Sequence, residues 1–340
     1  MKEIAAGQPE RSEGPGGSGR GDPILQFEVG QEIFHPARFL PSARKTRDLL
    51  LVCLSLWAAT LVPALTIATY NLENYLVADR MVEGVFRPGF PKPEKEREAL
   101  VTVVRGLAAD ILAVQEMGPQ PYLDDFQHEL REAGIDYPYA TLLEAADPDR
   151  HVAVLSRIAF KEVRRHRAVP ITYLGRTETV KRGVLEVVFA AADGDFSLFV
   201  IHLKSRHTER KDDPESASQR RQEAVAVRDL VLSRYPDPAN GRFVLCGDWN
   251  DTRTSKTVVT LTKGGSTPLG AVLPAADSHG ETWTHFFRRD DSYSRIDYLL
   301  VSAALAPFVA GNQATVYDGA GVREASDHRP VVVHLQLAAE

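Results

Sequence analysis

Hydrophobic and polar positions along this 340-residue chain predict a series of strands and helices from Leu65 onward. Apolar runs of strand length, many of them alternating or rich in β-branched residues, predict strands. These runs cover Leu65–Tyr70, Ile111–Glu116, His151–Arg157, Gly183–Ala190, Phe196–Leu203, Phe243–Cys246, Ser294–Ser302 and Val331–Leu337. Apolar stripes at helical spacing predict helices over Lys95–Ala108, Tyr122–Ala133 and Ser216–Arg234. The Gly and Pro residues of 79–93 predict a loop.

The order of these elements favours an α/β fold. The strands at 183–190 and 196–203 predict an antiparallel pair joined by a turn at Ala192–Asp195. Other neighbouring strands are separated by helices, which calls for parallel connections as well. Strands outnumber helices, and no second composition regime follows residue 65. We therefore expect residues 65–340 to form one α/β domain built on packed sheets.

The first 64 residues differ from the rest in composition. Residues 1–43, which include a Gly-, Pro- and Ser-rich stretch, predict a disordered extension or a segment upstream of the true start. Residues 44–64 combine a basic cluster, an apolar run and a small-residue ending, which predicts a signal peptide and a secreted or periplasmic protein. The alternatives are a membrane anchor over residues 49–64, for which the run is short, and a buried helix.

Composition and charge narrow the function classes. The content of 44% hydrophobic and 25% charged residues is ordinary for a soluble globular protein. A net charge of −6 argues against a protein that coats nucleic acid, although local basic patches are compatible with it. Residues 65–340 contain only Cys246, so no intramolecular disulfide forms there. No segment indicates a protein partner, and we expect a monomer.

The predicted strands end in polar side chains that bind cations and phosphates. Acidic and amide groups at strand ends lie where α/β folds usually place their sites. Asp248 and Asn250 are two residues apart and face the same way on an extended chain. The full set is Asn71, Glu116, His202, Asp248, Asn250, Asp297, Asp327 and His328.

These residue types suit phosphoryl chemistry. An oxygen-rich set without a Cys cluster favours Mg²⁺ or Mn²⁺ over zinc. Histidines beside carboxylates suit acid–base catalysis or stabilisation of transition-state charge, and a cation neutralises the phosphate. Each residue alone also has a structural interpretation: an Asn after a strand forms turns, and Asp297 pairs with Arg295 or Arg329. The complete set makes the functional interpretation stronger than any one member does.

In these motifs the chain resembles the endonuclease/exonuclease/phosphatase superfamily. Six stretches occur in the family's order: Tyr70–Asn74, Val114–Glu116, Ile201–Ser205, Gly247–Asn250, Ser294–Tyr298 and Ser326–His328. The resemblance covers about residues 65–337. It implies a four-layer αββα sandwich of two packed mixed β-sheets, with the site at one end of the sheets.

The resemblance also implies a role for each site residue. Glu116 would be the main Mg²⁺ (or Mn²⁺) ligand, with Asn71 beside it and Asp327 near the metal, either as a further ligand or behind the ligands. Asp248 would orient or deprotonate the attacking water, and Asn250 would hold a phosphate oxygen. His328, oriented by Asp297, would stabilise the phosphoryl oxygens, and His202 would protonate the leaving group. The expected reaction is in-line hydrolysis of a P–O bond.

Basic residues near the motifs are candidates for substrate binding. They are Arg157, Arg182, Lys204, Arg206 and Arg210. Trp283, Phe286 and Phe287 predict either a packed loop or a surface that contacts bases or lipid. Our first hypothesis is an exported nuclease acting on DNA or RNA. The alternatives are a phosphomonoesterase or phospholipase-like hydrolase for inositol phosphates or sphingomyelin, and a catalytically silent binding domain.

Overall fold

The computed structural model describes residues 64–263 and 267–337. The predicted extension at residues 1–43 and all of the predicted signal or anchor segment except Ala64 lie outside these residues. Within the described ranges, no helix is long and apolar enough to cross a membrane.

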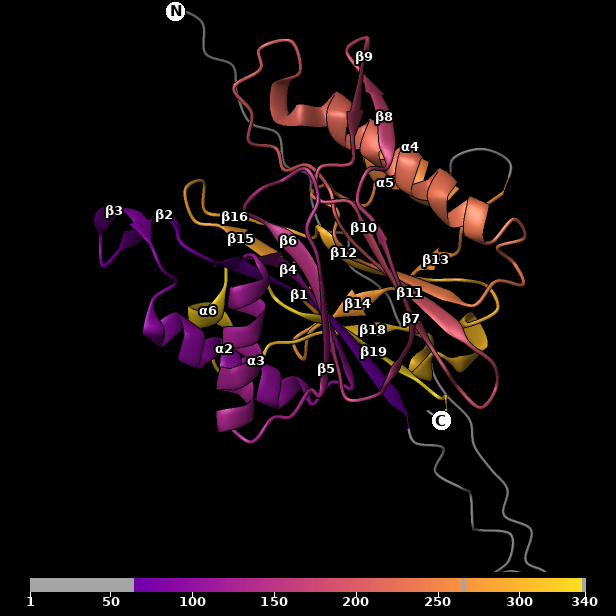
Figure 1. The fold of residues 1–340 in the computed structure, drawn as a ribbon, viewed down its shortest axis with the longest axis horizontal. Helices are drawn as coiled ribbons and strands as arrows, with labels where there is room; N and C mark the ends of the chain where they lie inside the picture. Colours follow the sequence, from indigo (N-terminus) through magenta and orange to yellow (C-terminus); the bar gives the residue numbers. More distant parts are fainter. Residues whose placement is uncertain (1–63, 264–266, 338–340) are drawn as a thin grey trace, which may run out of the picture. The chain divides into compact units, whose positions relative to one another are not determined.

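Two mixed β-sheets form the centre of the described domain (Figure 1). In the described residues the first sheet has seven strands, in the order β14-β18-β19-β1-β4-β6-β5. They span Leu65–Tyr75 (β1), Ile111–Met117 (β4), Tyr139–Leu143 (β5), His151–Ser156 (β6), Ala275–Ala276 (β14), Ala314–Val316 (β18) and Val331–Leu335 (β19).

The second sheet pairs six strands of the described chain in the order β13-β17-β12-β11-β10-β7. They span Phe160–His166 (β7), Val184–Phe189 (β10), Phe196–His202 (β11), Phe243–Asp248 (β12), Ala271–Val272 (β13) and Asp297–Val301 (β17). Separate hairpins join Ala78–Val82 (β2) to Val85–Phe90 (β3), Pro170–Tyr173 (β8) to Arg176–Thr179 (β9), and His285–Phe287 (β15) to Ser292–Ser294 (β16).

Helices cover the outer face of each sheet. Glu94–Leu107 (α2), Gln120–Glu132 (α3) and Val322–Ala325 (α6) share an apolar core with the first sheet. Ala217–Arg234 (α4) and Lys256–Lys263 (α5) share another with the second sheet, on the opposite side in Figure 1. A third core fills the space between the sheets, because alternate residues of each strand point inward. The predicted αββα sandwich is confirmed.

Two predicted elements are wrong in detail. Residues 79–93 contain the hairpin β2–β3, whose turn residues Glu83 and Gly84 both have positive φ and match the right-handed twist of the strands. The predicted strand Ser294–Ser302 is divided, since Ser294 ends β16 and β17 begins at Asp297. At the break, the Thr284 hydroxyl accepts hydrogen bonds from the backbone N–H groups of Ile296 and Asp297, each at 3.1 Å.

Candidate active site

The candidate site continues the inward-facing apolar rows of the second sheet. On β12, Val244 and Cys246 lie in the core between the sheets, and Asp248 is the next residue of that row. On β11, Val200 belongs to the same core and His202 follows it. Because β11 and β12 are parallel and pair His202 with Asp248, the two polar side chains end neighbouring rows at one edge. They are 1% and 2% exposed, respectively.

The first sheet supplies the opposite wall. Asn71 of β1 donates a hydrogen bond from Nδ2 to Oδ2 of Asp248 at 3.1 Å, which joins the two sheets. Asn250, just beyond β12, donates to the same Asp248 oxygen at 3.1 Å and from its backbone N–H to Oδ1 at 2.8 Å. The Asp248 carboxylate is therefore held in one orientation by three donors.

Glu116 reaches the site through a break in strand pairing. The register of β4 shifts around it on both sides, and its φ is 59°. Such a bulge turns a side chain out of the regular alternation, and bulges are frequent beside active sites. The backbone N–H of Asn74 donates to Oε2 of Glu116 at 2.9 Å. The other oxygen, Oε1, lies 4.0 Å from Nε2 of His202.

His328 is positioned from both sides of its ring. Its Nδ1 atom lies 2.9 Å from Oδ2 of Asp297. Its Nε2 atom lies 3.9 Å from Oδ2 of Asp248 and 3.9 Å from Oδ1 of Asp327. The Ser326 hydroxyl bonds the backbone of both His328 and Asn71, which ties this segment to β1.

Electrostatics give the two histidines opposite protonation states. Burial, followed by the positive charge of Arg182, holds the pKa of His202 well below its ordinary value. Burial acts against the charged form of His328 too, but the nearby carboxylates, Asp297 first, raise its pKa well above its ordinary value. His328 is therefore an imidazolium at neutral pH, and His202 is neutral. A neutral ring accepts a proton rather than donating one, which argues against His202 as the acid that protonates the leaving group.

Buried carboxylates share this end of the sheets. Burial, followed by the charge of Asp297, raises the pKa of Asp248 to about 7. Burial and the charge of Asp327 likewise raise the pKa of Glu73 to about 7. Accumulated negative charge of this kind favours a bound cation, which would neutralise it.

Several acidic and histidine side chains of the site could hold a divalent cation. Within the described ranges, two groups of three side chains bring their ligand atoms within 4.8 Å of one another: His285, Asp327 and His328, and Asp248, Asp297 and His328. Glu116 belongs to neither group; its contacts are with His202 and the backbone of Asn74. Of the predicted ligands Glu116 and Asp327, only Asp327 belongs to one of these groups, so the two carboxylates do not share one close cluster.

The predicted substrate-binding residues separate into three kinds of position. Lys204 and Arg206 follow His202 on a partly exposed loop, where Arg206 lies 3.6 Å from Asp251. Arg182 is 6% exposed and pairs with Asp147 at 2.9 Å, so it acts on the site through its charge rather than by direct contact.

Arg157 is the member of this set that the structure excludes. Strand β6 is antiparallel to β4, pairing His151 with Met117 and Ser156 with Ile111. Arg157 therefore follows the end of β6 that lies opposite the site, over the ring of Tyr137. The sequence shows its charge but not the direction of its strand.

Three residues near the site were not assigned from the sequence. Glu73 accepts a hydrogen bond from the backbone of Asp327 at 2.9 Å. His285 lies 3.6 Å from Asp327, and its ring centroid is 4.6 Å from that of His328. Arg150 donates to Asn74 at 2.7 Å. Glu73 stands in a quoted motif, whereas His285 and Arg150 carry no local signal and are brought in by the tertiary fold.

The comparisons with known proteins agree with this geometry. The sequence profile of the Endonuclease/Exonuclease/phosphatase family matches residues 68–328. The chain belongs to this family. Its members are phosphoric ester hydrolases that depend on divalent metal ions. No curated protein sequence matches the chain at a significant level.

Similar solved structures share the family fold. Sphingomyelinase C from Streptomyces griseocarneus aligns with a TM-score of 0.57 and 17% identity, over 80% of this chain and 99% of that one. Beta toxin from Staphylococcus aureus aligns with a TM-score of 0.55 and 13% identity, over 79% and 99%. The human nocturnin catalytic domain gives 0.54 and 16%, over 81% and 95%. At these identities the likeness establishes the fold alone.

Proposed function

We propose that the protein is a metal-dependent phosphodiesterase that hydrolyses nucleic acid. One observation carries the chemistry. Oδ2 of Asp248 lies 3.6 Å from Nε2 of His202 and 3.9 Å from Nε2 of His328, so a carboxyl group and two imidazole rings face one point. A phosphate placed there meets a proton acceptor and a cationic donor together.

A divalent cation is part of this proposal. Glu116 and Asn71 on one side, and Asp327 on the other, would hold Mg²⁺ or Mn²⁺, since all three offer oxygen ligands. When bound, the cation would neutralise phosphate charge and polarise the P–O bond. A beta toxin structure with bound magnesium ions is among the similar folds, which supports the choice of metal.

The chain's own residues would carry the proton and charge steps. Asp248, fixed by Asn71 and Asn250, would orient the attacking water and take its proton at Oδ2 as the new P–O bond forms and the bond from phosphorus to the leaving oxygen breaks. The leaving oxygen would then take a proton from solvent water. His328 would donate from Nε2 to a phosphoryl oxygen whose charge grows in the transition state, while Asp297 holds Nδ1. Asn250, predicted from the family resemblance to hold a phosphate oxygen, donates from its amide nitrogen to Asp248 and to the carbonyl of Leu203, so its role here would be to position Asp248. The neutral His202 would bind the phosphate by hydrogen bonding.

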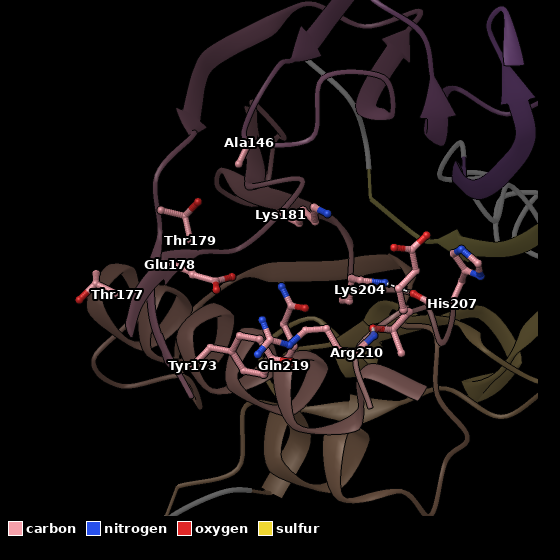
Figure 2. Close-up of a pocket in the computed structure, with 12 residues that line it drawn as sticks. Ala146, Tyr173, Thr177, Glu178, Thr179, Lys181, Lys204, His207, Arg210 and Gln219 are labelled. Atoms are coloured by element: carbon pink, nitrogen blue, oxygen red, sulfur yellow. Dashed lines mark hydrogen bonds between the residues drawn. The ribbon is translucent and has the colours of Figure 1, made fainter. Parts of the chain in front are cut away.

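A pocket beside the loop that follows His202 supports nucleic acid as the substrate through its lysines, since its arginine, Arg210, is already paired with Asp212. This pocket of about 690 Å³ lies among hairpin β8–β9, the loop after His202 and the start of α4 (Figure 2). Lys181, Lys204 and Arg210 line it, together with Glu178 and Glu209. Lys181 has no ion-pair partner among the described residues. A polyanion that crosses the site would place a flanking phosphate here.

A second candidate function is hydrolysis of a phospholipid such as sphingomyelin. The hairpin β2–β3 favours it, because Met81, Val85 and Phe86 are each more than half exposed on that hairpin. Exposed apolar side chains of this kind suit contact with a lipid surface. One of the similar structures, a sphingomyelinase C, is compatible with this alternative but shows only the fold.

A substrate panel tests the proposal. Full-length protein would be offered plasmid, single-stranded DNA, RNA and sphingomyelin vesicles, each with Mg²⁺, Mn²⁺ or EDTA. We expect metal-dependent nucleic acid cleavage that falls steeply with salt, and a weaker salt dependence in Lys181→Ala. Lys263→Ala, at the last residue of α5, serves as the matched control. Phosphocholine release without cleavage would favour the lipid alternative, and ligand binding without any turnover would favour a silent domain.

Export is a separate proposal. It depends on the apolar segment within residues 44–64, nearly all of which lies outside the described residues. Detection of the mature chain in the medium or periplasm, with an N-terminus near residue 65, would support a cleaved signal. Recovery of the intact chain in the membrane fraction would support an anchor.

A further inference from the structure

A second pocket borders the segment Ser326–His328, which carries the candidate catalytic histidine. Its volume is about 350 Å³, at the lower end of the usual range for small-molecule sites. Ser326 and Asp327 form one side, and aromatic side chains of the hairpin β15–β16 form the other. Asp327 belongs both to this pocket and to the candidate active site, so the two are neighbours.

Backbone hydrogen bonds hold the hairpin β15–β16 against residues 327–329. The N–H of Phe286 donates to the carbonyl of Asp327 at 2.9 Å, and the N–H of Arg329 donates to Thr284 at 2.6 Å. Within the hairpin, the rings of Phe286 and Tyr293 stack with centroids 4.7 Å apart and an interplanar angle of 20°. Tyr293 remains 56% exposed. An aromatic platform is thus held at a set position relative to His328.

The Trp283 ring is already occupied. Arg329 lies over its face, 3.4 Å from the centroid, and also pairs with Asp277 at 2.7 Å. Trp283 is therefore packed, and its ring also meets that of Tyr293 with centroids 4.9 Å apart. The contact-surface alternative stays a prediction for Phe286 and Phe287. Tyr293, which the sequence did not indicate, lies beside Phe286.

Two arginines give the pocket its charge. Arg288 and Arg323 line it and are exposed. Neither has an ion-pair partner among residues 64–263 and 267–337. The pocket's carboxylate, Asp327, is shared with the active site. Two unpaired guanidinium groups beside an aromatic platform repel a quaternary ammonium group, which aromatic cages otherwise bind. They attract phosphate.

We propose that this pocket holds an unpaired nucleobase next to the scissile phosphate, stacked on the exposed ring of Tyr293, which Phe286 backs, with Arg288 and Arg323 on the adjoining backbone phosphate. The inference rests on the proposed nuclease function and specifies its substrate. Bases within a duplex are stacked on their neighbours and cannot enter a side pocket without leaving the helix. The enzyme therefore prefers single-stranded nucleic acid.

The test compares two single-stranded oligonucleotides of equal length, one with bases and one with a tetrahydrofuran backbone that lacks them. Tyr293→Ala in the full-length chain is expected to lower kcat/KM about tenfold on the base-bearing strand and to leave the baseless strand unchanged. Tyr293→Phe should retain wild-type rates. Tyr139→Ala is the matched control, because Tyr139 is also exposed but pairs with Ser156, away from the site. Arg323→Ala should lower kcat/KM equally on both strands and reduce the salt dependence of cleavage.

Two results overturn the inference in distinguishable ways. Suppose that wild-type protein cleaves oligonucleotides, and that Tyr293→Ala lowers kcat/KM equally on both strands or leaves both unchanged. The base pocket is then wrong, and the nuclease function stands. If wild-type protein releases phosphocholine from sphingomyelin vesicles and cleaves no oligonucleotide, the nuclease function fails, and the inference fails with it.

Discussion

Nδ1 of His328 lies 2.9 Å from Oδ2 of Asp297, and both groups are buried between the two sheets. Asp297 stands at the start of β17, where the Thr284 hydroxyl bonds its backbone N–H. The pair fixes the orientation of the imidazole and stabilises its charged form. It therefore connects the packing of the second sheet to the charge that faces the substrate.

The first prediction concerns this pair. Asp297→Asn removes the charge that raises the pKa of His328, so the imidazolium is lost at lower pH. We expect turnover to fall about 100-fold or more and the alkaline limb of the pH–rate profile to move to lower pH. Initial rates across the pH range measure both effects. An unchanged alkaline limb would show that His328 does not act as the cation.

The second prediction concerns Asp248. Asp248→Asn preserves the shape of the side chain but removes the proton acceptor, so we expect turnover to fall about 1,000-fold or more with the fold retained. Asp229→Asn, on the exposed face of α4, is the matched control. Rates are compared with bis-p-nitrophenyl phosphate, and circular dichroism verifies folding. Near-wild-type turnover in a folded Asp248→Asn protein would refute the assignment.

The third prediction concerns stability of the metal-free protein. The pKa of Glu73 is about 7 in the folded state, above its ordinary value of 4.5. Between pH 4.5 and 7, Glu73 holds a proton in the folded state but not in the unfolded state. The contribution of Glu73 to the free energy of unfolding therefore declines as pH rises through this window. Glu73→Gln should therefore raise the free energy of unfolding by about 2–3 kcal/mol at pH 8 relative to its effect at pH 5. Urea titrations in EDTA at both pH values measure this; equal effects would contradict it.

The fourth prediction concerns Gly247, which precedes Asp248. Its φ is +132°, and a Cβ there would lie 1.9 Å from the carbonyl oxygen of Ile201 on β11. Gly247→Ala should lower the free energy of unfolding by about 2–3 kcal/mol because backbone has to move. Gly280→Ala separates the causes, since φ is +84° but nothing lies within 4 Å of the added Cβ. Equal losses in the two variants would remove the close approach as an explanation.

Much of the second sheet's contribution to the site follows from alternation in the sequence. Val244, Cys246 and Asp248 occupy every second position of one strand, so a buried row that ends in a carboxylate can be predicted from period two alone. The same reasoning applies to His202 on β11. The packing of the two sheets against each other follows from the resemblance of the six motifs to one family, and not from alternation in the sequence.

Other features depend on information that local patterns do not carry. The side chain of Glu116 points into the site because the register of β4 shifts against both neighbouring strands. This shift cannot be predicted without knowing which strands pair with β4. His285 comes from a hairpin whose strands are three residues long and lack a clear periodic signal. Arg157 was placed in the substrate-binding set from its charge, whereas strand direction puts it at the opposite end of β6.

The central claim is tested most directly by hydrolysis of bis-p-nitrophenyl phosphate with full-length wild-type protein and His328→Ala, each in Mg²⁺ and in EDTA. The account predicts turnover by the wild type in Mg²⁺, its loss in EDTA, its recovery when Mg²⁺ is restored, and a loss of about 100-fold or more in the variant. Turnover that persists in EDTA, or that survives in His328→Ala, would contradict a metal-dependent phosphodiesterase at this site.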